Sequence, residues 1–268
     1  MLKDITLGQY FPGNSPVHLL DPRTKLLALI AYIVALFSAG NWVSYGIVFI
    51  FLASAVAVSQ IPLKAIVSGM KPLVMILIFT GILNLFFTGG ETVLFTFGRI
   101  TITAEGVTRA IFMVVRILML ISATFLLTYT TSPISLTDGL ESLLGPLKKL
   151  HLPVHELAMM MCIALRFIPT LIEETDKIIS AQKSRGADFE NGRLIERVKA
   201  LVPILVPLFI SAFRRADELA TAMECRCYQG GDGRTKMKLL RFKLFDYYAF
   251  LLLVVLLSVV IFVASLGL

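Results

Sequence analysis

Two histidines and a neighbouring carboxylate come closest to a metal site in this sequence. His151 and His155 lie four residues apart, and Glu156 follows directly. On one helix face, two imidazoles at this spacing can share a zinc ion. Pro153 lies between them near an expected helix start, however, and no third ligand follows at a standard spacing. We therefore expect a polar helix start here and predict no metal site.

Other residue types that carry out catalysis lack the spacing that they need. Cys225 and Cys227 are separated by one residue, not by the two residues of redox and zinc motifs, so we interpret them as small interface residues. The sequence contains no Gly-x-x-x-x-Gly-Lys-Ser/Thr loop to hold ATP phosphates. No set of serine, histidine and aspartate suggests a hydrolase. We expect a chain that is not an enzyme and binds no cofactor itself.

Two arginines stand at equivalent places in a short internal repeat. Each follows a long amphipathic stretch and is flanked by small residues. A guanidinium between small neighbours at a helix tip can enter a groove of another protein and bind carboxylates or carbonyls there. The alternative is that both cations only complement the partial negative charge of a helix C-terminus. At an offset of 41 residues the matching pairs are Asp176 and Asp217, Ala181 and Ala222, and Arg185 and Arg226, with Ser184 and Gly186 flanking the first arginine and Cys225 and Cys227 the second.

The elements that must position these arginines are amphipathic helices. Apolar residues recur at helical spacing through 157–172 and through 194–209, and charged residues occupy the opposite faces. Glycines at 186 and 230–233 are expected to end the two helices. The second helix carries an apolar stripe with Leu201, Leu205 and Leu208. Such a stripe contacts either a membrane or another apolar protein.

The composition places most of the chain in a membrane. Of the 268 residues, 57% are hydrophobic and only 16% are charged, which excludes both an ordinary soluble domain and a disordered chain. Residues 131–244 nevertheless hold 17 of the 25 Lys and Arg and 13 of the 18 Asp and Glu. We predict a membrane region at 1–130, a polar segment at 131–244 and a last membrane helix at 245–268.

Five stretches are long and apolar enough to cross a bilayer, which takes about 20 helical residues. The first two form a helical hairpin, and a small β-hairpin is expected at 93–103 between the third and fourth. Arg116 lies inside the fourth stretch, where a charge either serves function or packs structurally within the bundle. The five stretches are 26–39, 43–59, 66–87, 107–130 and 247–266.

Basic residues in the loops predict the orientation. Lys3, Arg23 and Lys25 precede the first stretch, and Lys64 and Lys71 follow the second. Because cytoplasmic loops are enriched in Lys and Arg, the N-terminus and the segment 131–244 should be cytoplasmic and the C-terminus outside. A basic cluster before the last stretch suits lipid headgroups. The mixture of acids and bases in 131–244 gives little support for nucleic-acid binding.

Several motifs in this order resemble the transmembrane T component of energy-coupling factor transporters, the EcfT family. The segment Gly8-Gln9-Tyr10-Phe11-Pro12-Gly13-Asn14-Ser15 is followed by Leu20-Asp21-Pro22-Arg23-Thr24-Lys25, four apolar stretches, Ser184-Arg185-Gly186-Ala187-Asp188, the 222–228 stretch and a final span. The resemblance covers nearly the whole chain. It implies that Ser184-Arg185-Gly186 and Cys225-Arg226-Cys227 are two coupling motifs, each docking into one of two ABC-type ATPases. The second motif departs from the family pattern, because cysteine replaces the glycine that would follow Arg226.

The resemblance implies an all-α integral membrane protein with about five transmembrane helices and a cytoplasmic coupling domain of about three long amphipathic helices, in the bacterial cell membrane. ATP and Mg would then be bound by the partner ATPases. The stripe of Leu201, Leu205 and Leu208 would hold a membrane-embedded substrate-binding S component, and uptake of vitamins or other micronutrients would be the function. The alternative is a secondary transporter that works without ATP, which an array of intramembrane ionisable residues would favour.

Overall fold

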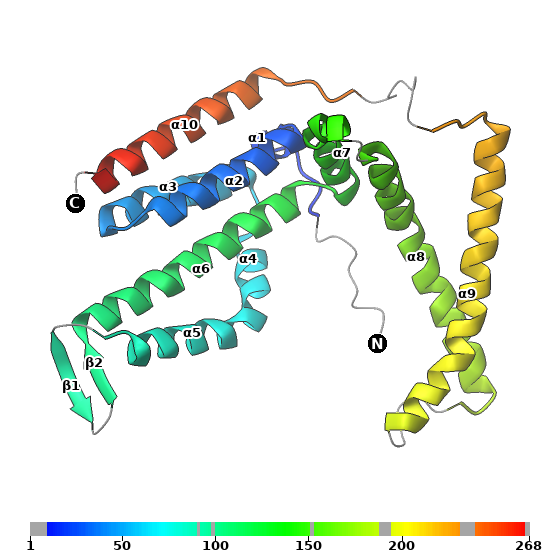
Figure 1. Ribbon diagram of the computed structural model, residues 1–268, viewed down its shortest axis with the longest axis horizontal. Coiled ribbons are helices and arrows are strands. Elements are labelled where there is room, and N and C mark those ends of the chain that lie inside the picture. The colour runs from blue at the N-terminus through cyan, green and yellow to red at the C-terminus, as the bar shows by residue number, and fades with distance from the viewer. Residues whose placement is uncertain are drawn as a thin grey trace. The chain divides into compact units, whose positions relative to one another are not determined.

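The computed structural model describes residues 10–89, 92–97, 100–150, 153–187, 194–230 and 239–265 (Figure 1). The chain divides into two compact units. One comprises residues 8–139 and 240–268, and the other residues 140–239. The second unit is therefore inserted into the sequence of the first, and the two are described separately below.

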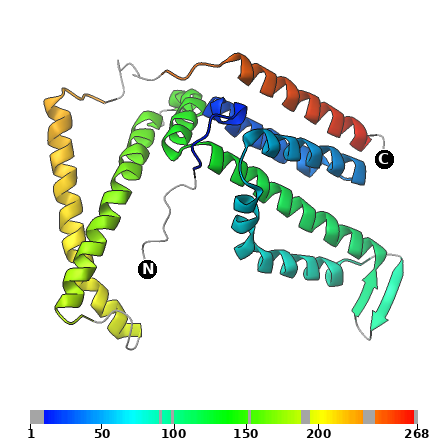
Figure 2. The same ribbon diagram turned by 180° about the vertical axis from the view of Figure 1, so that it is seen from behind.

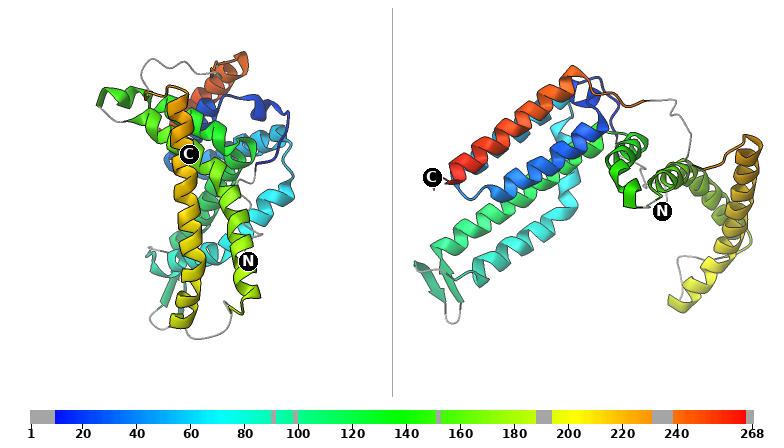
Figure 3. Two further views of the ribbon diagram at one scale, coloured as in Figure 1. Left: turned by 90° about the vertical axis from the view of Figure 1, so that its right-hand side faces the viewer. Right: turned by 45° about the horizontal axis from the view of Figure 1, so that its top comes forward.

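The larger unit is a bundle of apolar helices. In Figure 3, α2, α3, α6 and α10 lie side by side, and α2 packs against both α10 and α6. The elements that belong wholly to this unit are α1 (Pro16–Leu19), α2 (Pro22–Ser38), α3 (Trp42–Ser59), α4 (Leu63–Met70), the 3-10 turn η1 (Lys71–Leu73), α5 (Val74–Phe87), β1 (Val93–Phe97), β2 (Ile100–Thr103), α6 (Ala104–Thr130) and α10 (Leu244–Ser265).

The smaller unit contains the polar segment. It begins within α7 (Pro133–Leu143), continues through the 3-10 turn η2 (Gly145–Leu150) and is dominated by α8 (Val154–Ser184) and α9 (Leu194–Cys225), of 31 and 32 residues. The sequence predicted about three long amphipathic helices here. Two are long, and α7 has only 11 residues.

Five helices in the described residues are long and apolar enough to cross a membrane, so the fold is that of an all-α integral membrane protein. Four of them coincide with predicted spans: α3, α4 with α5, α6 and α10. The first predicted span corresponds to α2, which has 17 residues and is about 26 Å long at 1.5 Å per residue. In its place α8 meets the same criterion, although it has the lowest mean hydropathy of the five, 1.4.

The third predicted span is not one helix. A 3-10 turn at Lys71–Leu73 separates α4 from α5, and the two axes meet at a sharp angle in Figure 1. Pro72 lacks a backbone N–H and its ring excludes the carbonyl of the preceding turn, so a straight helix through this position is disfavoured. The sequence prediction of a single span at 66–87 overlooked this proline.

The predicted hairpin is present between α5 and α6. Strands β1 and β2 pair antiparallel, with Phe97 opposite Ile100 and Val93 opposite Thr103. Thr103 ends the hairpin and begins α6, because its hydroxyl accepts the backbone N–H of Gly106 at 3.1 Å. The hairpin is the only sheet among the described residues.

The core of the membrane unit joins α2, α3, α6 and α10. Leu36 of α2, Val48 of α3, Met119 of α6 and Val260 of α10 are all buried in one cluster. Close packing extends to α4, where a Cβ on Gly69 would lie 2.9 Å from the ring of Phe125. The absence of a side chain at Gly69 therefore allows α4 to approach α6.

The Leu20–Lys25 motif ties the first helix of the bundle to the last. Asp21 caps α2 by accepting the N–H of Arg23, and its own N–H donates to Asp246 of α10 at 2.9 Å. Asp246 is fully buried, and its other oxygen accepts the N–H of Lys243 at 2.7 Å. This carboxylate therefore caps α10 and fastens it to α2.

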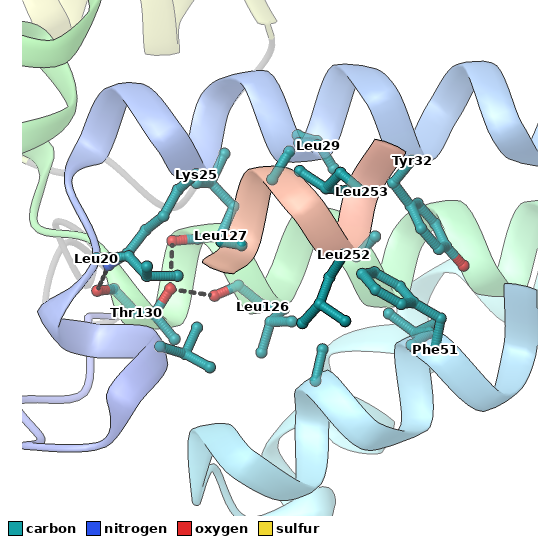
Figure 4. A pocket seen from close by; sticks show the side chains of 16 residues that line it. Leu20, Lys25, Leu29, Tyr32, Phe51, Leu126, Leu127, Thr130, Leu252 and Leu253 are labelled. Atoms are coloured by element: carbon teal, nitrogen blue, oxygen red, sulfur yellow. Dashed lines mark hydrogen bonds between the residues drawn. The ribbon is translucent and has the colours of Figure 1, made fainter. Parts of the chain in front are cut away.

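Lys25 closes the same end of the bundle. Its ammonium donates to the carbonyl of Thr130 at 2.8 Å (Figure 4) and to that of His18 at 3.3 Å. Beside it lies a cavity of about 170 Å³ lined mainly by leucine and alanine side chains of α2, α3, α6 and α10. Because its cation is already engaged and the remaining lining is mostly apolar, the cavity offers little to recognise a polar substrate.

Arg116 packs structurally. Its guanidinium donates to the carbonyl of Ala39, the residue that ends α2, at 3.2 Å, and lies 5.1 Å from the ring centre of Phe37. A cation at this place satisfies a helix-terminal carbonyl and complements the helix dipole. The contact connects α6 to the turn between α2 and α3 and gives this intramembrane charge a structural explanation.

Candidate functional site

The first arginine terminates α8 in a well-defined turn. Arg185 is the C-cap, and Gly186 follows with φ of +85°. The N–H of Ala187 donates to the carbonyl of Gln182 at 3.0 Å, and that of Gly186 to Lys183 at 3.0 Å. These two bonds and the left-handed residue define a Schellman motif. The prediction that Gly186 ends α8 is thereby confirmed, with Gly186 directly after the C-cap.

The second arginine terminates α9 in the same way. Arg226 follows the last helical residue, and Cys227 adopts φ of +56°. The N–H of Tyr228 donates to the carbonyl of Met223 at 3.1 Å, and that of Cys227 to Glu224 at 2.8 Å. Cysteine therefore takes the left-handed conformation that glycine takes after Arg185. A cysteine at this position thus makes the same two turn hydrogen bonds as the glycine of the first tip.

The repeat found in the sequence extends to side-chain contacts. Ser180 donates its hydroxyl to the carbonyl of Asp176 at 2.7 Å, and Thr221 donates to Asp217 at 2.9 Å. These pairs are again 41 residues apart. The last three turns of α8 and α9, with the turns that follow them, are thus two copies of one local structure.

Both arginines are accessible. Arg185 and Arg226 are exposed, as are the small residues on either side of each, and neither guanidinium forms an ion pair within the described part of the chain. Helices α8 and α9 run in opposite directions and cross (Figures 1 and 2). The two arginine tips therefore lie at opposite ends of the helix pair.

A polar contact joins the two helices between the tips. Glu174 of α8 accepts a hydrogen bond from the hydroxyl of Ser211 and forms an ion pair of 3.0 Å with Arg215 of α9. Ile204, at the same helical face of α9, is buried. The spacing of 204, 211 and 215 is that of one helix face, so this face of α9 is directed toward α8.

The predicted apolar stripe is only partly covered in the structure. Leu208 is half-buried, whereas Leu201, which lies two turns earlier on nearly the same side of the helix, and Leu205 are 47% and 57% exposed. The face opposite α8 is also apolar and exposed. Its members are Val202, Val206, Phe209 and Phe213, which we call the outer face of α9, and all are at least half exposed.

No cluster of three His, Cys, Asp or Glu residues that could hold a metal ion occurs among the residues that the structure describes. His151 lies outside those residues. His155 instead pairs with Glu141 of α7 at 3.0 Å. Cys225 and Cys227 both carry exposed, free thiols.

Sequence reasoning missed three positions that organise this site. Glu174 and Arg215 were treated as charges on solvated faces, and Ser211 was not considered. A signal was present, because Glu174 and Arg215 are related by the same offset of 41 residues as the two arginine tips. Oppositely charged residues at equivalent positions of two helices suggest a contact between them.

Comparisons with known proteins agree with these features. The family described as CbiQ, cobalt transport protein, matches residues 13–237. The energy-coupling factor transporter transmembrane protein EcfT of Ruminiclostridium cellulolyticum is 55% identical over 246 residues, 92% of each chain. The protein of that name from Clostridium kluyveri is 53% identical over 260 residues, 97% of this chain and 96% of the relative. That from Bacillus subtilis is 50% identical over 238 residues, 89% of this chain and 90% of the relative.

The matched stretches are long enough to include the membrane helices and both arginine-tipped ends. Together with the five membrane-length helices, it shows a multi-pass membrane protein of a transporter. The chain belongs to the EcfT family of energy-coupling factor transporter transmembrane proteins.

Proposed function

We propose that this chain is the coupling subunit of an ATP-driven importer. In this proposal two ABC-type ATPase subunits bind the two arginine tips, and a membrane-embedded S component binds the apolar surface of the coupling helices. Closure and opening of the ATPases would move the tips, and the helices would pass that motion to the S component. ATP and Mg would be bound by the ATPases.

The observation that carries this proposal is the structural equivalence of the two tips. Arg185 and Arg226 occupy the same position of the same helix-terminating motif, at opposite ends of an antiparallel pair. Two related ATPase subunits present two related grooves, so a subunit that contacts both needs two similar anchors pointing away from each other. Exposed arginines with small flanking residues meet this requirement.

The outer face of α9 supports the second part of the proposal. Phe209 and Phe213 are 66% and 59% exposed, and their rings contact each other edge to face at 4.8 Å between centres. A contiguous apolar surface of this kind on a helix marks contact with another apolar surface. An S component embedded in the membrane would supply one, and the cargo would be a vitamin or another micronutrient.

The proposal also includes the orientation of the chain in the membrane. With α2, α3, α4 with α5, α6 and α10 crossing the membrane, an N-terminus in the cytoplasm puts residues 140–239 in the cytoplasm and the C-terminus outside. Helix α8 would then be cytoplasmic despite its apolar first half. Its charged second half, which contains Glu173, Glu174 and Asp176, supports this placement.

Replacing both arginines tests the proposal. The variant with Arg185→Ala and Arg226→Ala should lose the ATPases when the tagged chain is purified from membranes in mild detergent. Truncation of a buried arginine anchor costs about 2 kcal/mol or more, roughly a 30-fold loss of affinity at each tip. Arg214→Ala is the matched control, because Arg214 is exposed on α9 but lies away from the tip. Undiminished copurification with the double variant would refute docking at the tips.

A further inference from the structure

The contact at Glu174 occupies a special place relative to the two tips. Arg185 follows Glu174 by eleven residues, and Arg226 follows Arg215 by the same number. At 1.5 Å per residue, each tip is about 17 Å from the contact along its helix axis. Because the helices are antiparallel, the contact lies between the tips, at equal distances from both.

The charges around this contact are complementary at equivalent positions. Glu173 and Glu174 of α8 correspond, at the offset of 41 residues, to Arg214 and Arg215 of α9. Of these four, Glu174 and Arg215 form the ion pair across the helices, whereas Glu173 and Arg214 are exposed. The repeat is therefore nearly symmetric in structure but opposite in charge at its centre.

Few side chains of α8 and α9 are fully buried among those that the structure describes. Among the α9 side chains that the structure describes, Ile204 alone is buried. On α8 the buried residues are Val154 and Ala158, near the far end of the helix. Near the ion pair, Leu171, Ile178 and Leu208 are only half-buried, so the apolar interdigitation that resists changes in crossing angle is limited among these described side chains. A small polar contact can instead stay intact while the two axes rotate about it.

We propose that Glu174, together with Ser211 and Arg215, is the fulcrum on which α8 and α9 turn. With equal arms of about 17 Å, a change of about 10° in crossing angle displaces each tip by about 3 Å. The ion pair is partly exposed, with 36% of the Arg215 side chain and 24% of the Glu174 side chain accessible, so its contribution to folding is small. Its role is to position the helices. This inference rests on the proposed docking of ATPases at the tips.

Reversal of the two charges can be accommodated by the same symmetry. Ser211 on α9 corresponds to Thr170 on α8 at the offset of 41 residues. After Glu174→Arg and Arg215→Glu, the new carboxylate at position 215 of α9 would have the hydroxyl of Thr170 on α8 at the place equivalent to Ser211. The double reversal should therefore restore the ion pair that either single reversal breaks.

The test measures the distance between α8 and α9 on one side of the contact, in the complete complex. Spin labels are placed at Ala164 and Thr221, which are exposed and lie ten residues before Glu174 and six residues after Arg215, in a chain with Cys162→Ala, Cys225→Ser and Cys227→Gly. Pulsed electron paramagnetic resonance then compares the copurified complex without nucleotide and with ATP and vanadate. We expect a nucleotide-dependent shift of about 1 Å or more in the parent chain, because arms of about 15 and 9 Å change their separation by about that amount for a rotation of about 10°.

Each single reversal should keep the ATPases bound but broaden the distance distribution and abolish the nucleotide-dependent shift. The double reversal should restore the narrow distribution and the shift. The matched control reverses Glu173 and Arg214, singly and together, and should leave the shift unchanged. A shift that survives Glu174→Arg, or one that the double reversal does not restore, overturns the fulcrum while leaving docking intact. If the chain with its natural cysteines retains no ATPases, the docking proposal fails, and the fulcrum fails with it.

Discussion

Gly186 and Cys227 occupy the same position of the same helix-ending motif, with φ of +85° and +56°. Glycine adopts this left-handed conformation without steric cost, whereas a residue with a Cβ is strained in it. The first arginine tip is therefore relaxed and the second is strained. Steric crowding does not require glycine at position 186, because a Cβ there would meet no atom within 4 Å. The left-handed backbone conformation is what favours glycine.

Cys227→Gly should stabilise the chain. Relief of the left-handed strain is worth about 1–2 kcal/mol, and the greater freedom of glycine in the unfolded chain offsets about 0.5–1 kcal/mol of that. A rise of about 2–4 °C in the melting temperature of the purified chain follows for each net kcal/mol. Cys225→Gly is the control, since Cys225 is the last helical residue and glycine is unfavourable there. A lower melting temperature for Cys227→Gly would contradict the strain argument.

Thiol labelling of the two tip cysteines should block docking at the second tip. Cys225 and Cys227 are exposed and flank Arg226, whereas Cys162 is half-buried in α8. A bulky maleimide on either tip cysteine would occupy the space that a docking groove must enclose, so labelling before assembly should prevent ATPase binding. The variant with Cys225→Ser and Cys227→Gly, which copies the first tip, should be resistant. Equal sensitivity of this variant would assign the effect to Cys162.

Charged substitutions on the outer face of α9 should release the S component selectively. Phe209→Lys or Phe213→Lys places an ammonium in an apolar contact, at a cost of several kcal/mol if the charge is buried. The ATPases should stay bound, because both residues lie away from the tip at Arg226. The control is Glu218→Lys, an exposed position of the same helix. Quantitative mass spectrometry of the purified complexes gives the amounts of S component and of ATPase per tagged chain. Loss of the ATPases with retention of the S component would contradict our assignment of this face.

Asp246→Ala should destabilise the membrane unit. It leaves the backbone N–H groups of Asp21 and Lys243 without their buried acceptor, and each unsatisfied group costs about 1–3 kcal/mol. The melting temperature should fall, and protease should cut more readily in the connection before α10. Glu218→Ala, an exposed carboxylate, should change neither. An unchanged melting temperature for Asp246→Ala would mean that α10 is held by apolar packing alone.

Patterns that depend on neighbours in the sequence were predictable. The alternation in 93–103 predicted the hairpin. The repeat of Arg185 and Arg226 predicted two equivalent helix ends, and Gly186 predicted the end of α8. The break at Pro72 was also readable in principle, since a proline inside an apolar stretch disfavours a straight helix. The break was not predicted because the apolar stretch 66–87 is long enough to cross the membrane as one helix.

Contacts between distant residues were not predictable from the same patterns. Asp246 follows Asp21 by 225 residues, and only the packing of α10 on α2 brings the two together. Leu208 has the same side chain as Leu201 and Leu205, yet it is half-buried whereas they are 47% and 57% exposed. Which apolar positions of a helix face a partner depends on where the neighbouring helix crosses, and periodicity alone does not contain that information.

Photocrosslinking at the two helix ends tests the central claim most directly. A photoreactive amino acid is placed at Lys183 or Glu224, the equivalent residues two positions before each arginine, and a control is placed at Arg214. Irradiation of intact membranes should link each tip position to an ABC-type ATPase, while the Arg214 position should give little ATPase adduct. Adducts with lipid or with membrane proteins only, at both tip positions, would contradict the assignment of Arg185 and Arg226 as the anchors of two ATPases.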